Sequence, residues 1–224
     1  MAGLAVVLAV LVAHNLVGNL ILPSAAYVPV NLTVAMALLA VARASGLSWE
    51  DLGLAGSSVG RGLAVGAAAF LVVSVVLAVG AAVPATRPLF EDERADLAGW
   101  ALVYQGLVRI PLGTVVLEEV AFRGVLLGLL GQGRSTVAAV AWSSAVFGLW
   151  HVVPTVEALR TNRLDPTVAA VAGAVVVTAV AGVAFCWLRL RSGSLVAPAL
   201  AHVATNSVAL VLAAAVLHTT SGST

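Results

Sequence analysis

Long apolar stretches separated by short polar breaks follow one another along almost the whole chain, and this pattern constrains the fold more than any other feature. A helix that crosses a bilayer needs about 20 predominantly apolar residues, because the hydrocarbon core is about 30 Å thick. We therefore expect seven spanning helices and an all-α fold class, a polytopic bundle in the membrane. They are predicted at about residues 3–22, 26–43, 62–83, 99–130, 136–153, 167–189 and 195–217.

The composition leaves no room for a separate soluble domain. Of the 224 residues, 61% are hydrophobic and 9% are charged, whereas about a quarter of a soluble domain is charged. The net charge of +1 argues against a nucleic-acid partner, because phosphate binding needs a concentrated basic face. The single cysteine, Cys186, is expected to be a small packing residue. Residues 1–224 are predicted to form one transmembrane domain.

Glycine and proline predict how some of the spans pack. Pro111 and Gly113 indicate that the long fourth span tilts or bends. Two pairs of glycines have the small-xxx-small spacing that lets helices approach closely, and we expect them to mediate packing within the chain rather than dimerisation. These pairs are Gly62 with Gly66, and Gly124 with Gly128.

Within the fourth span, the run 117–124 carries three charged residues close together, Glu118, Glu119 and Arg123. Each charge costs roughly 2.5–3.5 kcal/mol on insertion scales, so the three side chains must face protein or water. Residues four apart share a helix face, and Glu119 is therefore predicted to pair with Arg123. Glu118 lies about 100° further round the helix and is left without a local partner. This makes Glu118 a candidate general base.

Two further polar clusters lie on other spans with helical spacing. Phe147 and His151 share one face, and His202 and Asn206 share another. Taken singly, each histidine fits a hydrogen-bonded packing residue as well as a ligand, and Phe147 fits a core residue. Together with the carboxylates they offer the ligand types that suit zinc, and a glutamate that can take a proton from water.

These three runs resemble the signature of a known family. Glu118-Glu119-xxx-Arg123, Phe147-xxx-His151 and His202-xxx-Asn206 are similar in order and spacing to the motifs of the CAAX prenyl protease and bacteriocin-processing (CPBP, or ABI) intramembrane proteases. The segment 48–54 is also similar to a loop often found upstream of these motifs in bacterial members. The likeness covers about residues 45–210.

The resemblance implies a hydrolase that cleaves a peptide bond of a membrane-associated protein or peptide, from within the lipid bilayer of a bacterial cell. It implies that Glu118 activates the attacking water together with His151. It also implies that His202 and Asn206 help to bind a metal or stabilise the oxyanion. If Zn²⁺ takes part, its ligands would be Glu118, His151 and His202. A metal-free attack driven by Glu118 is the alternative.

The remaining residues of the motifs are expected to support this site. Glu119 and Arg123 are assigned by their spacing to an ion pair, and Phe147 lies one helical turn before His151. The predicted spans put His202 and His151 at depths of about 12 and 22 Å from one membrane side, at 1.5 Å per residue. Tilt, a kink near Pro198 or shifted span boundaries must therefore bring the two histidines together.

Two other functions fit the buried charges. A small transporter or membrane scaffold could use the same glutamate, arginine and histidine side chains as a proton relay or ion pathway, although this does not explain the three spaced motifs. A catalytically inactive family member that acts by binding is the second alternative. The sequence does not determine the substrate, the use of prenylated proteins or the oligomeric state.

Overall fold

All of the long apolar stretches form helices. The computed structural model describes residues 2–221, and within them there is no β-strand. The predicted spans correspond in order to seven long helical segments. These are α1 (Ala2–Leu20), α2 (Tyr27–Ala44), α3 (Val59–Ala82), the continuous run α4–α6 (99–131), α7 (Thr136–Trp150) with α8 (Val152–Thr161), α9 (Val168–Ser192), and the run α10–α11 (196–221).

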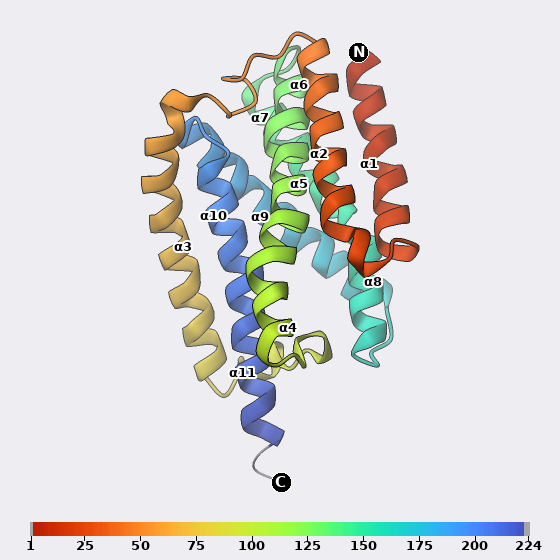
Figure 1. The fold of residues 1–224 in the computed structure, drawn as a ribbon, viewed down its shortest axis with the longest axis vertical. Coiled ribbons are helices and arrows are strands. Elements are labelled where there is room, and N and C mark those ends of the chain that lie inside the picture. The colour runs from red at the N-terminus through yellow and green to blue at the C-terminus, as the bar shows by residue number, and fades with distance from the viewer. Residues whose placement is uncertain (1, 222–224) are drawn as a thin grey trace.

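Six of these segments are long and apolar enough to cross a membrane. The chain is therefore a multi-pass integral membrane protein, as predicted. The segment outside this set is α4–α6, which carries Arg109, Glu118, Glu119 and Arg123. It stands in the middle of the bundle, between α2 and the α10–α11 run (Figure 1). The part of this helix that carries Glu118, Glu119 and Arg123 is thus the part that its neighbours bury.

The central helix changes its winding along its length. It runs through α4 (Gly99–Tyr104), the π-helical η5 (Gln105–Val115), α5 (Val116–Glu118), the π-helical η6 (Glu119–Leu126) and α6 (Leu127–Gly131). Pro111 lies in η5 and has no N–H to donate to the preceding turn. The wider π-helical turns accommodate the proline, and the helix continues through Pro111 and Gly113.

The surface of the bundle is apolar and its interior holds polar side chains. Val12, Leu71 and Val176 are more than 60% exposed. By contrast, Asn31, Ser143 and Ser144 are buried, as are Glu118, Glu119 and Arg123. An apolar surface with polar groups buried among apolar core residues suits a lipid environment, where polar groups must find partners inside the protein.

Glycines allow the close helix contacts that their spacing predicted. A Cβ atom at Gly62 would lie 2.6 Å from Ser194 Oγ, and one at Gly66 would lie 2.8 Å from Leu200. Ser194 lies directly before α10 (Val196–Val203), and Leu200 lies within it. The two glycines therefore allow α3 to pack closely against α10 of the same chain. The predicted intramolecular packing is confirmed at this pair.

The loop between α2 and α3 is bound tightly to the helix bundle. Ser48 and Asp51 form reciprocal hydrogen bonds, and the backbone N–H of Ser48 holds the pKa of Asp51 below its usual value. The guanidinium of Arg189 donates to the carbonyls of Glu50 and Asp51, both at 2.9 Å. Gly53 has a φ of +74° and leaves room for that guanidinium, because a Cβ there would lie 2.1 Å from Arg189 Nε.

A second loop, residues 84–98, connects α3 to α4 and is fastened to the end of α8. It contains the short helices η3 (Arg87–Phe90) and η4 (Glu93–Ala95). Asn162 accepts a hydrogen bond from the backbone of Glu93 and donates to Asp92, and Arg94 binds Asp92 at 2.5 Å. Burial by itself raises the pKa of Asp92, but the hydrogen bonds from Arg94 and Asn162 outweigh it and lower the pKa to about 2.

Candidate active site

The two glutamates of the central helix are adjacent in sequence but have different partners. Glu118 ends α5 and Glu119 begins η6, and both side chains are buried. Arg123 donates from Nη1 to Oε1 of Glu119 at 3.1 Å, with its side chain fully buried. The ion pair predicted from their spacing is confirmed. Each charge of the pair compensates the burial of the other.

His202 connects the two glutamates. Its Nδ1 lies 2.7 Å from Oε1 of Glu119, and its Nε2 lies 3.7 Å from Oε2 of Glu118. Because the ionised Glu119 carboxylate only accepts hydrogen bonds, Nδ1 carries the proton and donates it to Glu119. Nε2 is then the ring nitrogen that faces Glu118. The Glu119 contact fixes this orientation in the way that a second-shell carboxylate orients a histidine.

Aromatic rings enclose the Glu119–Arg123–His202 cluster. The guanidinium carbon of Arg123 lies 3.9 Å from the ring centre of Phe147 and 4.9 Å from that of Phe185. His202 stacks on Phe185 with the ring centres 5.0 Å apart. The negative ring faces stabilise the cation and keep water away from it. Phe185 was missed in the sequence because it lies on α9, outside the three motifs.

Trp150 and His151 follow Phe147 at the end of α7 and line the other side of Glu118. The indole Nε1 of Trp150 donates to Oε1 of Glu118 at 3.0 Å. Nδ1 of His151 lies 2.7 Å from the carbonyl oxygen of Phe147, so it carries a proton and donates it. This leaves Nε2 of neutral His151 with a lone pair. Sequence reasoning missed Trp150, although its place directly before His151 and its single N–H donor were available signals.

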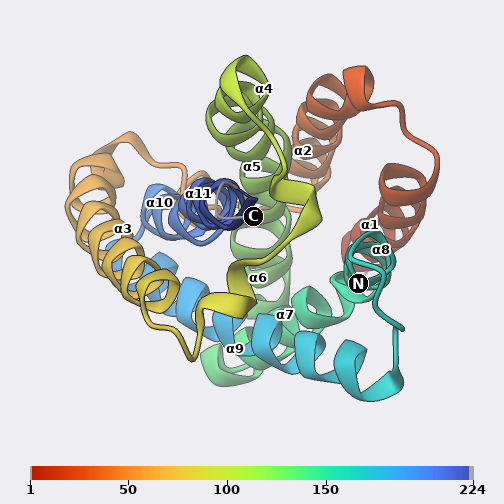
Figure 2. The same ribbon diagram turned by 90° about the horizontal axis from the view of Figure 1, so that it is seen from below.

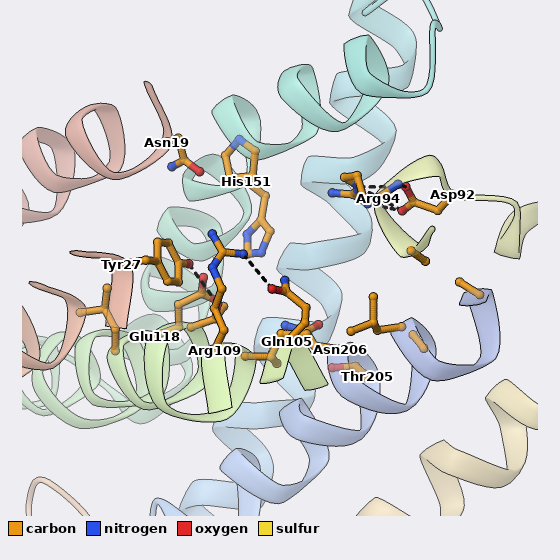
Figure 3. Close-up of a pocket in the computed structure, with 18 of the residues that line it drawn as sticks. Asn19, Tyr27, Asp92, Arg94, Gln105, Arg109, Glu118, His151, Thr205 and Asn206 are labelled. Carbon is orange, nitrogen blue, oxygen red and sulfur yellow. Dashed lines mark hydrogen bonds and ion pairs between the residues drawn. The ribbon is translucent and has the colours of Figure 1, made fainter. Parts of the chain in front are cut away.

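A cavity of about 930 Å³ borders this group of residues. Glu118, His151 and Asn206 all line it, together with Trp150 and Thr205. Figure 3 shows side chains from the central helix, from the turn after α7 and from η7 (Ala204–Val208) around the same space. Further polar residues on its wall are His14, Asn19, Tyr27, Asn31, Asp92, Arg94, Gln105, Arg109 and Thr114. None of these further residues was predicted, because no motif spacing connects them to the site.

The structure separates the predicted site residues into two groups. Glu118, His151 and Asn206 line the cavity, whereas His202 lies behind Glu118, against Glu119. The rings of His151 and His202 both contact Phe147, at centre distances of 4.6 and 6.1 Å. The two depths derived from the sequence were therefore misleading. Figure 2 shows α7 and α9 running obliquely, while α11 is seen almost end-on, so residues along α7 gain little depth.

The zinc site suggested by the sequence can be tested against these positions. Among residues 2–221, no three histidine, cysteine, aspartate or glutamate side chains converge closely enough to hold a metal ion. Structural and catalytic zinc sites use at least three protein ligands. As they lie, Glu118, His151 and His202 do not fit such a site, and the zinc expected from the resemblance stays a prediction.

Comparison with protein families relates the chain to a known family. A family model described as Type II CAAX prenyl endopeptidase Rce1-like matches residues 99–208. This range begins at the start of α4 and ends within the α10–α11 run, so it contains all three motifs. No curated protein and no solved structure matches the chain.

Proposed function

Since the chain belongs to the Rce1-like family of CAAX prenyl endopeptidases, which are hydrolases, we propose that it cleaves a peptide bond of a membrane-associated protein or peptide. The reaction takes place in the 930 Å³ cavity, to which the substrate comes from the lipid bilayer. One observation carries the assignment: the buried carboxylate of Glu118 borders the same cavity as His151 and Asn206. Residues 1–224 act as one protease domain of a bacterial cell membrane.

Glu118 is the general base in this proposal. Its Oε1 is held by Trp150, whereas Oε2 is buried and has no hydrogen-bond partner among the described residues. A buried carboxylate oxygen of this kind has the capacity to accept a proton from water. The proton moves to Glu118 as the water oxygen forms a bond to the substrate carbonyl carbon.

Asn206 acts on the carbonyl oxygen of the substrate, and His151 acts on the attacking water. The side-chain amide of Asn206 donates to the carbonyl oxygen as it becomes an oxyanion. The lone pair on Nε2 of His151 assists Glu118 in binding the attacking water. When the tetrahedral intermediate collapses, the C–N bond breaks and the proton held by Glu118 passes to the leaving amine nitrogen. The products are one carboxylate and one amine, so the step balances without another reactant.

His202 is a positioning residue for Glu118. We assign the oxyanion to Asn206 and not to His202, because Asn206 lines the cavity and His202 does not. The Nε2 of His202 lies 3.7 Å from Oε2 of Glu118 and limits where that carboxylate can turn. The Glu119–Arg123 pair in turn holds His202, with Phe147 packed against all three motifs. This chain of contacts supports a preorganised base.

Zinc remains a separate question for this proposal, because the mechanism above routes no step through a metal. Elemental analysis of the purified protein tests it directly. One equivalent of zinc in wild type, and its loss in a His151→Ala variant, would show that the site residues converge on a metal. Activation of water by the metal would then replace the activation by Glu118 proposed above.

Mapping of new peptide termini tests the proposed function. Wild type, Glu118→Gln and Glu157→Gln are each reconstituted in lipid nanodiscs and incubated with membrane proteins from cells that lack this chain. Glu157 is an exposed glutamate on α8 and serves as the matched control. New N- and C-termini are expected with wild type and Glu157→Gln only. Equal cleavage by Glu118→Gln would refute the base, and proton-coupled flux in vesicles without any cleavage would favour the transporter.

A further inference from the structure

His14 and Asn15 are buried polar residues of α1 that the proposed reaction does not use. Apart from these two residues and Asn19, α1 consists of apolar residues and glycine. The helix stands at the edge of the bundle beside α2 (Figure 1), and it lies outside the range 99–208 that matches the family. Apolar side chains would pack such a helix at a lower cost, since each buried polar group needs a partner. The partners of His14 and Asn15 therefore indicate what the two residues do.

Both residues contact Trp150, whose indole donates to Glu118. The side-chain amide of Asn15 donates to the backbone carbonyl oxygen of Trp150 at 3.0 Å. The ring of His14 stacks on the indole, with the ring centres 6.3 Å apart and an angle of 24° between the planes. Phe122 of the central helix makes an edge contact with the same indole, at 5.5 Å between ring centres. Asn15 thus holds the backbone of Trp150, and His14 and Phe122 restrict its ring.

His14 is itself tied to the central helix through Asn31 of α2. The amide nitrogen of Asn31 donates to the carbonyl oxygen of Gly113 at 2.9 Å. Its amide oxygen lies 2.8 Å from Nε2 of His14 and can only accept, so Nε2 carries a proton and donates it. Both side chains are buried. A hydrogen-bonded chain from the central helix through α2 to α1 therefore fixes the ring of His14 against Trp150.

We propose that His14 and Asn15 are positioning residues that hold the indole N–H of Trp150 on Oε1 of Glu118, an inference that rests on the proposed hydrolase function. The direction of this N–H depends on the side-chain torsions of Trp150, which the single hydrogen bond to Glu118, at 3.0 Å, does not fix alone. The contacts from α1 supply the missing constraints. They matter for a general base, because a misplacement of about 1 Å costs about 10²-fold in rate.

Asn15 distinguishes positioning from direct contact with a substrate. His14 lines the cavity, so a bound substrate has access to it. Asn15 does not line the cavity, and its amide binds the carbonyl oxygen of Trp150 instead. An effect of Asn15 on the chemical step must therefore pass through Trp150. We expect this effect in kcat, with KM nearly unchanged, because the substrate does not meet Asn15.

The indole N–H of Trp150 offers a measurement that needs no substrate. Full-length protein with isotope-labelled tryptophan in phosphatidylcholine nanodiscs gives an NMR cross peak for each indole N–H, and Trp150→Phe identifies the peak of Trp150. Glu118→Ala removes the acceptor and marks the position of the unbonded indole. We expect His14→Ala and Asn15→Leu to shift the Trp150 peak toward that position. The control Thr33→Ala, at an exposed residue of α2 whose hydroxyl bonds within its own helix, should leave the peak in place.

Kinetics on a cleaved peptide test whether these contacts act on the reaction. His14→Ala and Asn15→Leu should each lower kcat about 3- to 10-fold, the range for one hydrogen bond between uncharged groups, with little change in KM. In the Trp150→Phe background the same changes should have no further effect, because the N–H that they position is already absent. His14→Phe keeps a ring against the indole and should recover part of the loss. Because leucine suits an apolar span, Asn15→Leu keeps the test valid if His14→Ala does not fold.

Several results would overturn the assignment. An unchanged Trp150 peak in Asn15→Leu would show that α1 does not set the position of the indole. Equal losses of kcat with and without the Trp150 indole would mean that the two residues act by another route. A loss confined to KM in His14→Ala would make His14 a substrate contact. The expected shift of the Trp150 peak, without cleavage by wild type, would keep the positioning of Trp150 and refute the hydrolase instead.

Discussion

Glu118 and Glu119 are consecutive buried glutamates, and they differ in almost every contact. Glu119 is bound by Arg123 and His202 inside a cluster that Phe147 and Phe185 close off. Glu118 accepts one hydrogen bond from Trp150, borders the cavity, and keeps its second oxygen unbonded to the described residues. A step of about 100° round the helix separates the two environments.

This comparison shows that burial alone does not identify a reactive group. Both glutamates are at most 7% exposed, and burial is costly for each of them. In both residues Oε2 has no hydrogen-bond partner among the described residues. What distinguishes the two carboxylates is which groups surround them. Glu119 binds Arg123 and His202 through Oε1, as expected of a structural charge. Glu118 has no cation beside it and lines the cavity, which Glu119 does not.

The largest expected effect is the difference between Glu118→Gln and Glu119→Gln. Glutamine at position 118 keeps the shape but cannot accept the proton, so cleavage should fall by about 10²–10⁴-fold or more with thermal stability nearly unchanged. Glutamine at position 119 leaves Arg123 buried without a counter-charge and should lower thermal stability in detergent. If both variants lost cleavage and thermal stability to the same extent, the assignment of Glu118 to catalysis and Glu119 to structure would be wrong.

Removal of Arg123 should affect folding more than chemistry. Arg123→Ala leaves Glu119 unpaired at a cost of about 3–5 kcal/mol, so the folded yield should fall well below that of Glu118→Ala. The matched control is Arg160→Ala, which removes the exposed partner of Glu157 and should not change stability measurably. Size-exclusion profiles and unfolding curves measure both. Equal yields for Arg123→Ala and Glu118→Ala would contradict the pairing.

Asn206→Ala should slow cleavage less than the change at Glu118. The loss of one oxyanion donor costs about 10²–10³ in rate, and the effect should fall on kcat with little change in KM. Steady-state kinetics on a cleaved peptide measure this. An unchanged kcat would remove Asn206 from the reaction and make His202 the next candidate donor.

Trp150→Phe tests how Glu118 is held. Phenylalanine keeps an aromatic ring at the end of α7 but removes the N–H that donates to Oε1 of Glu118. We expect a loss of about 10- to 100-fold in kcat, the range for one hydrogen bond to a charged group, and a shifted pH profile. A change in thermal stability with an unchanged pH profile would mean that Trp150 only packs against Phe122.

The smallest expected effect concerns the loop over the cavity. The folded-state pKa of Asp92, about 2, is lower than its usual value of 3.8. Its contribution to stability is therefore present above pH 3.8 and is lost as the pH falls from there through about 2. Hydrogen exchange of residues 89–97, taken relative to the intrinsic rate of an unstructured chain at the same pH, should increase in wild type as the pH falls across this window. In Asp92→Asn it should already be faster at pH 5, and no difference at pH 5 would refute the contribution.

The sequence by itself determined the membrane class, the number of long helices and the Glu119–Arg123 pair. These depend on local quantities: the length of an apolar run and the four-residue spacing on one helix. The family was also recognisable, because its three motifs have short internal spacings. The positions of His151 and His202 could not be obtained in the same way, since depth along a span depends on the tilt of α7 and α9.

Only the tertiary structure decided which polar residues face the cavity. Tyr27, Arg109 and Trp150 come from three helices and acquire their roles from packing between elements far apart in the chain. The hydrophobic periodicity of the sequence does not predict contacts between residues on different helices. The same is true of the choice between Glu118 and Glu119. Both positions are equally polar in the sequence, and the helices packed on each face determine which carboxylate is enclosed and which one meets the cavity.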